Sequence, residues 1–275
     1  MIAWTDYQAG EHRIECPSCG RGGRDKTAGL TIEYGGEGVL HCFRCSHVEY
    51  HRPGRGAVRR VPTIKPERAT VDKHHSLSDW GRAFWRDCKS LSGVALQYLH
   101  SRRCAIPPQD GDLRWHPAVR HPAGYVGPAL VGLITDVMTR QLLSLHRTWI
   151  QADGRKADVD PPRLLLGGHR KQGGCIRLWP DDAVTHGLAV AEGLETGLSL
   201  AHGYQPVWSL IDAGNLAALP VLGGVEVLVI GADNDVAGRA AAELCACRWV
   251  EAGREVLVTR QAANDLNDVL LEAAA

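Results

Sequence analysis

Residues 227–241 read VLVIGADNDVAGRAA, and this stretch decides which fold the chain adopts. A run of apolar residues, typical of a buried strand, leads through Gly-Ala to Asp233 and Asp235. Residues two apart in an extended segment point to the same side, so both carboxylates face one place and repel each other. Either Asp235 caps the following helix or the pair binds a cation; the cap leaves Asp233 unexplained. Gly238 in that helix costs about 1 kcal/mol relative to alanine, which indicates a close approach by the sheet or a phosphate.

The segments around this stretch alternate between strands and helices. The alternation predicts an α/β domain, a small Rossmann-like parallel sheet wrapped by helices, with its ligand site beyond the carboxyl ends of the strands. Glu192 ends the first strand, so the fold brings it to the same rim as Asp233 and Asp235. The predicted strands are residues 187–193, 206–214, 225–235 and 255–260, and the predicted helices are 195–204, 215–222 and 235–253.

Carboxylates at strand ends predict a divalent cation site. Mg²⁺ (or Mn²⁺) binds one or two carboxylates and shares the rest of its shell with water and substrate phosphates. Asp233 and Asp235 are the expected pair, and Glu192 is a third ligand or a general base. A further acidic set, Asp265 and Asp268, follows the last strand.

Four cysteines near the N-terminus form two CxxC pairs, Cys16 with Cys19 and Cys42 with Cys45. Residues 31–34 and 38–43 alternate as short strands around GGEG, and the resulting hairpin brings the pairs together. Four thiolates on two turns match a tetrahedral structural zinc site. The alternative, a redox dithiol, is disfavoured because the motif is duplicated.

Charge is distributed unevenly along the 275 residues, although the formal net charge is zero. Residues 1–180 hold 27 Lys and Arg against 17 Asp and Glu, whereas residues 181–275 hold 4 against 14. A basic front suits a polyanion and an acidic rear suits metal ions, although accidental surface charge gives the same counts. The sequence has neither a signal peptide nor a transmembrane run, so we expect a cytoplasmic protein without a membrane partner.

The chain divides into four predicted parts. Residues 1–50 form the zinc-ribbon β module, and residues 51–75 form a basic, proline-containing linker. Residues 76–184 form a mixed α+β basic subdomain, with helices over 77–91 and 92–104, a polar stretch over 114–127, and a mixed or antiparallel sheet over 128–180. Residues 185–275 form the α/β domain.

AEGLET (residues 191–196) followed by GADNDVAGRAA (residues 231–241) resembles the Toprim domain. With a four-cysteine module in front, the chain is similar to zinc-containing DNA primases of bacteria and phages. The middle section resembles the basic subdomain of small primases from phages and mobile elements. The resemblance implies that Glu192 is the essential glutamate, that Asp233 and Asp235 are the metal-binding pair, and that Asp265 or Asp268 contributes a further carboxylate. It also implies that the four cysteines bind zinc.

The implied activity is synthesis of short RNA primers on a single-stranded DNA template from NTPs, in replication of a phage, plasmid or other mobile element. A replicative helicase is a candidate partner, although the chain has no GxxxxGK[ST] loop of its own. Two alternatives stay open: a Toprim nuclease, and a non-catalytic zinc-dependent single-stranded-DNA-binding accessory protein of replication or recombination. The residues expected to hold template or nucleotide are Arg147, Lys156, Arg163, Arg170 and Lys171.

Overall fold

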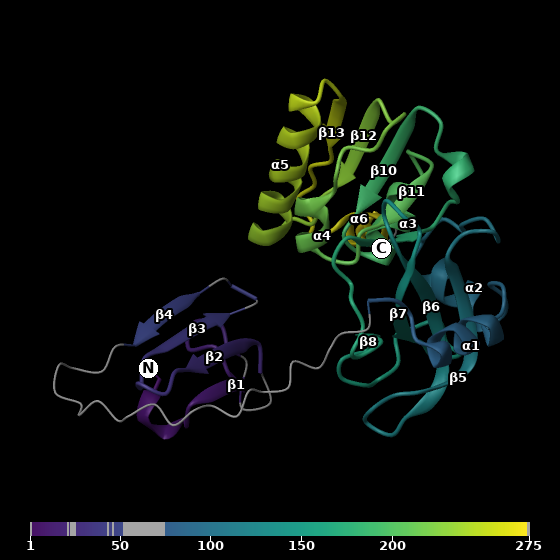
Figure 1. The fold of residues 1–275 in the computed structure, drawn as a ribbon. Helices are drawn as coiled ribbons and strands as arrows, with labels where there is room; N and C mark the ends of the chain where they lie inside the picture. The colour runs from purple at the N-terminus through teal and green to yellow at the C-terminus, as the bar shows by residue number, and fades with distance from the viewer. Residues whose placement is uncertain are drawn as a thin grey trace. The chain divides into compact units, whose positions relative to one another are not determined.

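The computed structural model describes residues 2–20, 22, 26–42, 44–45, 47–51 and 75–273. Most of the basic linker predicted for residues 51–75 therefore lies outside the described residues. The chain separates into two compact units, Met1–Thr70 and Val71–Ala275, and each is described by itself (Figure 1).

The smaller unit is an antiparallel sheet whose strands follow one another in chain order. The predicted hairpin is confirmed: β2 pairs with β3, and Glu33 and Glu37 close the turn between them through a 2.7 Å backbone hydrogen bond. Alternate residues such as Leu30 and Leu40 are buried, as expected for a sheet with one covered face. The elements are η1 (Trp4–Asp6), β1 (Gly10–Ile14), β2 (Ala28–Ile32), β3 (Gly38–Cys42) and β4 (Val48–His51).

The larger unit contains a sheet in which a parallel and an antiparallel part are continuous. Its order is β13-β12-β10-β11-β9-β6-β7-β8, and β5 pairs separately with β6. Strands β10 to β13 are parallel to one another, and the remaining pairings are antiparallel. The antiparallel elements and their helices are α1 (Asp79–Asp87), α2 (Val94–Ser101), β5 (Leu113–Arg120), β6 (Val126–Asp136), β7 (Leu142–Trp149), β8 (Arg163–Leu165), β9 (Gly174–Arg177) and η2 (Asp181–Ala183).

One prediction for this part is wrong. Residues 114–127 were expected to be a polar stretch ahead of the sheet, but residues 114–120 belong to β5, which pairs with β6. The strand is irregular because its register shifts between His116 and Val119, next to Pro117, which cannot donate a ladder hydrogen bond. Only Leu113 and Val119 of this strand are buried, so the alternation that marks a strand is weak here.

The predicted parallel sheet wrapped by helices is confirmed. Alternate strand residues face opposite sides: Ala189 and Val229 pack with α3, whereas Leu188 and Leu228 pack with α4 and α5. The elements are β10 (Gly187–Ala191), α3 (Leu194–Leu200), β11 (Val207–Ser209), α4 (Ala213–Ala218), β12 (Val227–Gly231), α5 (Val236–Glu251), β13 (Glu255–Val258) and α6 (Leu266–Glu272).

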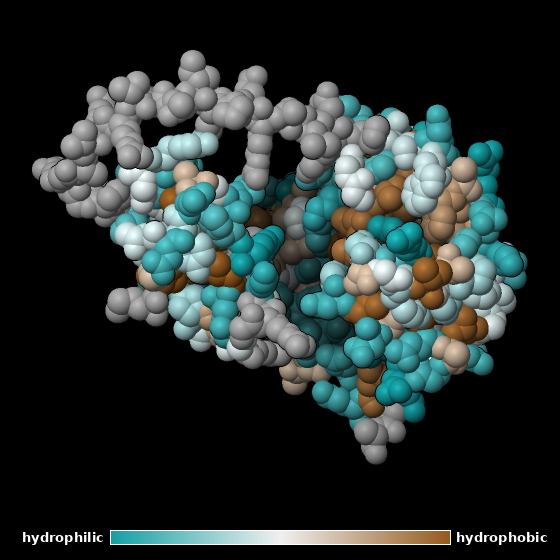
Figure 2. Space-filling model, turned by 90° about the horizontal axis from the view of Figure 1, so that it is seen from below, coloured by the Kyte–Doolittle hydropathy of each residue, from teal (hydrophilic) through white to brown (hydrophobic). Residues whose placement is uncertain are grey.

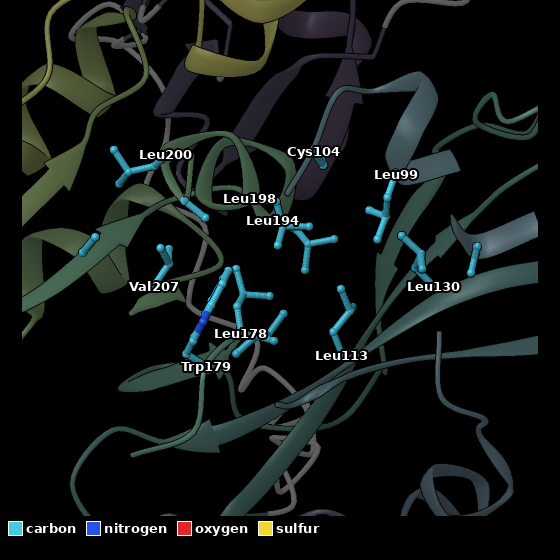
Figure 3. Close-up of a cluster of buried hydrophobic side chains, with 14 of the residues drawn as sticks. Leu99, Cys104, Leu113, Leu130, Leu178, Trp179, Leu194, Leu198, Leu200 and Val207 are labelled. Atoms are coloured by element: carbon cyan, nitrogen blue, oxygen red, sulfur yellow. The ribbon is translucent and has the colours of Figure 1, made fainter. Parts of the chain in front are cut away.

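A shared core joins the basic and parallel parts of this unit. Figure 3 shows Leu194 and Leu198 of α3 together with Leu99 of α2 and Leu130 of β6, and all four side chains are buried. Strand β11 also pairs with β9, so the sheet continues across residue 184, the predicted boundary between the basic subdomain and the α/β domain. Helix α3, which follows Glu192, is therefore held against both parts.

The visible surface is mixed in character. On the face shown in Figure 2, hydrophilic side chains surround small groups of hydrophobic ones. None of the helices in the described ranges is sufficiently long and apolar to span a bilayer.

Candidate active site

The four N-terminal cysteines lie together as a cluster that could hold a metal ion. The Sγ atoms of Cys16, Cys19, Cys42 and Cys45 all lie within 4.8 Å of one another. Cys16 and Cys45 are 3.7 Å apart, and Cys19 and Cys42 are 3.6 Å apart. A Zn–S bond of about 2.3 Å in a tetrahedron places the sulfur atoms roughly 3.8 Å apart, so the donor set fits zinc.

Backbone amides support this cluster from both turns. The Ser18 N–H donates to Cys16 Sγ and the Arg44 N–H donates to Cys42 Sγ, each at 3.4 Å. Such bonds favour thiolates, which are the form that binds the metal. The predicted ligand set is therefore brought together by the smaller unit alone.

We expect the protein to hold about one zinc ion per chain, and Cys16→Ser or Cys42→Ser to release it. Zinc binding supplies on the order of 10 kcal/mol to a module of this size, so its loss should unfold the smaller unit. The larger unit should keep its melting temperature within about 2 °C, because it has its own core. Elemental analysis and thermal melting measure both effects, with exposed Cys247→Ser as the control. Melting of the larger unit together with the smaller one would contradict this expectation.

Carboxylates follow each of the four parallel strands, and we call this set the acidic rim. Residues Ala191 and Gly231 are in register between β10 and β12, so Glu192 and Asp233 leave the sheet at the same level. The predicted convergence of these residues is what the structure shows. The acidic rim comprises Glu192, Asp212, Asp233, Asp235 and Asp265.

Three members of the acidic rim cap helices. Asp235 Oδ1 accepts a 2.7 Å hydrogen bond from the Gly238 N–H at the start of α5. Asp212 and Asp265 cap α4 and α6 in the same manner, and Asp268 provides the N–H that Asp265 accepts. Asp233 caps no helix; it accepts a 3.4 Å bond from the Thr196 hydroxyl.

Gly238 packs directly against Glu192 and Asp233, the two residues of the acidic rim that cap no helix. A Cβ atom at this position would lie 2.6 Å from the Asp233 carbonyl oxygen and 2.8 Å from Glu192 Oε1. The close approach predicted from the sequence is thus made by the acidic rim itself. A glycine here lets the first turn of α5 come against the Glu192 carboxylate.

The environment of the acidic rim disfavours the ionised forms of Glu192 and Asp233. Burial, followed by the charges of Asp233, Asp235 and Asp212, raises the pKa of Glu192 to about 8. Burial and the charge of Asp265 raise the pKa of Asp233 to about 6. In addition, Glu192 Oε1 is buried without a hydrogen-bond partner among the described residues.

These observations fit a divalent cation. An unpartnered buried carboxylate oxygen beside a second carboxylate needs either a proton or a positive charge. The donors are oxygens, which Mg²⁺ and Mn²⁺ prefer. Glu192 and Asp233 are the residues that would hold the ion, with Asp235 and Asp265 near enough to act on their charge.

The sequence of this region matches a known family. Residues 187–275 match the Toprim domain model, and residues 76–178 match a family described as a domain of unknown function (DUF7146). Residues 187–275 form a Toprim domain. The predicted resemblance is confirmed, and Glu192, Asp233 and Asp235 lie in the Toprim part. No curated protein matches the chain in sequence.

Solved structures similar to this chain include three primases. One is the primase fragment of the bacteriophage T7 primase-helicase protein, with 18% identity, 95% of each chain covered and a TM-score of 0.45. Another comprises the zinc-binding and RNA polymerase domains of the Aquifex aeolicus primase, with 14% identity, 98% of this chain and 80% of that one covered, and a TM-score of 0.45. The third is a DNA primase domain from Pseudomonas aeruginosa, with 15% identity, 65% and 67% covered, and a TM-score of 0.42.

Three of the five predicted basic residues lie at the Toprim domain. Lys156 Nζ is 3.1 Å from Glu195 Oε1, and Arg163 Nη1 is 3.5 Å from Glu195 Oε2. Lys171 Nζ is 2.7 Å from Asp212 Oδ2 in the acidic rim. Lys171 is thus paired with a carboxylate of the acidic rim, whereas Lys156 and Arg163 are held by Glu195, next to Thr196, which contacts Asp233. We call these three cations the basic flank.

The other two predicted basic residues have local partners. Arg170 Nη2 is 2.8 Å from Asp136 Oδ2. Arg147 Nη2 donates to the Leu165 carbonyl oxygen at 3.0 Å and lies over the Trp149 ring. Neither residue is brought to the acidic rim by these contacts.

Two residues of the site were not predicted. Asp212 directly follows the apolar segment around β11, and this position at a strand end was a signal comparable to that of Asp233. Glu195 lies at the start of α3 and is 4% exposed, although a charged residue in a short helix normally faces water. Its spacing of three residues from Glu192 is the only local sign of its role.

Burial opposes ionisation of Glu195, but its partners outweigh that effect. Lys156, Arg163 and the Tyr98 hydroxyl, which donates to Oε1 at 2.7 Å, lower the pKa of Glu195 to about 2. The side chain is therefore an anion at neutral pH. It connects α3 to α2 and to the segments that carry Lys156 and Arg163.

Proposed function

We propose that the protein is a DNA primase that synthesises short RNA primers on single-stranded DNA from NTPs, with Mg²⁺ or Mn²⁺. The observation that carries this proposal is the approach of Glu192 and Asp233 to the same helix turn at Gly238, with the cations Lys156, Arg163 and Lys171 on the neighbouring carboxylates Glu195 and Asp212. Phosphoryl and nucleotidyl transfer require carboxylates that bind a metal ion and, next to them, cations that bind phosphates. The four-cysteine unit and the Toprim domain support the same function.

The reaction joins a 3′-hydroxyl to an α-phosphate and releases pyrophosphate. A divalent cation bound by Glu192 and Asp233 supplies neutralisation of the phosphate charge. Asp235 and Asp265, which also cap helices, fix the carboxylate framework around that charge. In the alternative role for Glu192, its carboxylate accepts the hydroxyl proton as a general base.

The basic flank would hold the triphosphate or the template. Arg147 and Arg170 are assigned to other contacts with template, because their contacts are with Leu165 and Asp136 and not with the acidic rim. The zinc unit would present the single-stranded template. A replicative helicase as partner, a cytoplasmic location and service to a phage, plasmid or other mobile element belong to the same proposal.

The test is incubation of the full chain with single-stranded DNA, NTPs and Mg²⁺, followed by separation of labelled products. We expect short oligoribonucleotides that require both template and metal. Shortening of the DNA instead would support a nuclease, and binding without either product would support an accessory protein. Both of these outcomes would overturn the proposal.

In magnesium-free buffer, Glu192 and Asp233 are expected to contribute less to the stability of the protein as the pH rises from about 5 to 8. The folded pKa values of Glu192, about 8, and of Asp233, about 6, lie above the ordinary values of 4.5 and 3.8. Their stabilising contribution is therefore complete below the ordinary values and is lost as the pH rises through the folded ones. Mg²⁺ should reverse the loss.

Thermal melting across this pH range, with and without Mg²⁺, measures the effect. Glu192→Gln cannot ionise, so it should show a weaker pH dependence and a smaller response to Mg²⁺. An unchanged pH slope in this variant would contradict the assigned environment of Glu192.

A further inference from the structure

The basic flank poses an electrostatic problem for a metal site. Arg163 pairs with Glu195, whose neighbour Thr196 donates a 3.4 Å hydrogen bond to Asp233, so the guanidinium lies near the acidic rim. Its side chain is 48% exposed, and its ion pair with Glu195 is a single 3.5 Å contact. A guanidinium with five donors that was free at this place would pair with the nearest carboxylate. Asp233 and Glu192 would be the available partners, and the cation would then compete with Mg²⁺.

Glu195 supplies an alternative partner for these cations. It is 4% exposed and receives Lys156 at 3.1 Å, Arg163 at 3.5 Å and the Tyr98 hydroxyl at 2.7 Å. Helix α3 holds its backbone, since the Ser199 hydroxyl donates to the Glu195 carbonyl oxygen and the neighbouring Leu194 and Leu198 are buried. The carboxylate is thus a fixed anchor, while the two cations are partly exposed, with side chains 29% and 48% accessible.

We infer that Glu195 is a positioning residue that holds Lys156 and Arg163 beside the metal-binding carboxylates but off them. This inference rests on the proposed function, because it takes Glu192 and Asp233 as the metal ligands. Held in this way, Lys156 and Arg163 keep donors available for the phosphates of a nucleotide. Glu192 and Asp233 keep their oxygens available for the divalent cation.

Calorimetric titration with Mn²⁺ alone, on the zinc-loaded full chain, tests the inference without turnover. Glu195→Gln preserves the side-chain shape and an acceptor for Tyr98, but removes the charge that anchors the cations. We expect Mn²⁺ binding to weaken about tenfold or more, because Lys156 and Arg163 then pair with the acidic rim. Tyr98→Phe, which removes one hydrogen bond from Glu195 and leaves its charge, is the matched control and should stay within about threefold of wild type.

A comparison of combined variants separates positioning from the charge of Glu195 acting through space. Glu195→Gln should have little effect, less than about threefold, when Lys156→Gln and Arg163→Gln are already present. The same tenfold weakening in that background would overturn the inference. If the single variant Glu195→Gln fails to fold, the double variant Lys156→Gln/Arg163→Gln can still be compared with the triple variant that also carries Glu195→Gln. This comparison still tests the inference, because neither variant contains a cation that has lost its partner.

The outcomes also distinguish this inference from the proposed function. If wild type binds Mn²⁺ and Asp233→Asn does not, but Glu195→Gln binds as wild type does, only the positioning role fails. If wild type and Asp233→Asn bind Mn²⁺ alike, the metal site itself is wrong and the inference fails with it.

Discussion

Replacing Asp233 with asparagine is expected to reduce primer synthesis by about a thousandfold or more, since it removes the charge of one of the two carboxylates proposed to bind the metal ion. Asp233 lies at the end of β12, close to Glu192 and Gly238, and its side chain caps no helix. The neutral amide would keep the size and the contact with Thr196. The loss of primer synthesis would therefore result from the removed charge and not from altered packing.

A gain in stability should accompany this loss of activity. Because burial and Asp265 raise the pKa of Asp233, its ionised form destabilises the metal-free protein at pH values well above about 6. Asp233→Asn should therefore melt at a higher temperature than wild type in magnesium-free buffer at such pH. A variant that loses activity because it misfolds would melt lower.

Two further variants complete this comparison. Asp235→Asn keeps the cap of α5, because asparagine caps as well as aspartate, so it isolates the charge of Asp235 from its structural role. Exposed Asp182→Asn lies in η2, outside the acidic rim, and should leave synthesis unchanged. Full activity in Asp233→Asn would remove Asp233 from the site.

Replacing Gly238 with alanine is expected to reduce Mg²⁺-dependent synthesis by about a hundredfold or more, because a methyl group displaces Glu192 and Asp233, the proposed metal ligands. The added Cβ would lie 2.6 Å from a backbone oxygen of Asp233 and 2.8 Å from Glu192 Oε1. The backbone oxygen cannot move aside as the end of a flexible side chain can. Either α5 or the end of β12 must shift.

Stability should fall only modestly in the same variant. Overpacking of this kind costs about 1 to 3 kcal/mol. This cost in folding free energy is partly offset, because alanine is about 1 kcal/mol more favourable than glycine in a helix. Denaturant unfolding and Mg²⁺ titration of Gly238→Ala measure the two effects separately.

Gly223→Ala is the control for this experiment, because no atom lies within 4 Å of a Cβ atom there. It should match wild type in both stability and synthesis. Normal Mg²⁺ binding by Gly238→Ala would contradict the close packing of α5 on Glu192.

The strongest local patterns predicted the fold of the Toprim domain. Alternation of apolar strands with helices is encoded within short windows, and the carboxyl ends of parallel strands must meet at one edge. Glu192 and Asp233 could therefore be placed together before the structure was known. The cluster of four cysteines could also be predicted from the sequence, because the spacing within each CxxC pair defines a turn.

Features that depend on distant partners could not be predicted in this way. Strand β5 contains Pro117 and alternates weakly, so its identity comes from pairing with β6. Glu195 resembles a surface charge until Tyr98, Lys156 and Arg163 are brought to it from other elements. For the same reason the sequence did not separate Lys156 and Arg163, which reach the site, from Arg170, which pairs with Asp136.

The most direct test of the account is the mass of the product that the wild-type chain releases from single-stranded DNA, NTPs and Mg²⁺. The account predicts short oligoribonucleotides with a 5′-triphosphate, complementary to the template, and none from Asp233→Asn. Unchanged DNA with no new oligonucleotide, or DNA fragments in place of RNA, would contradict it.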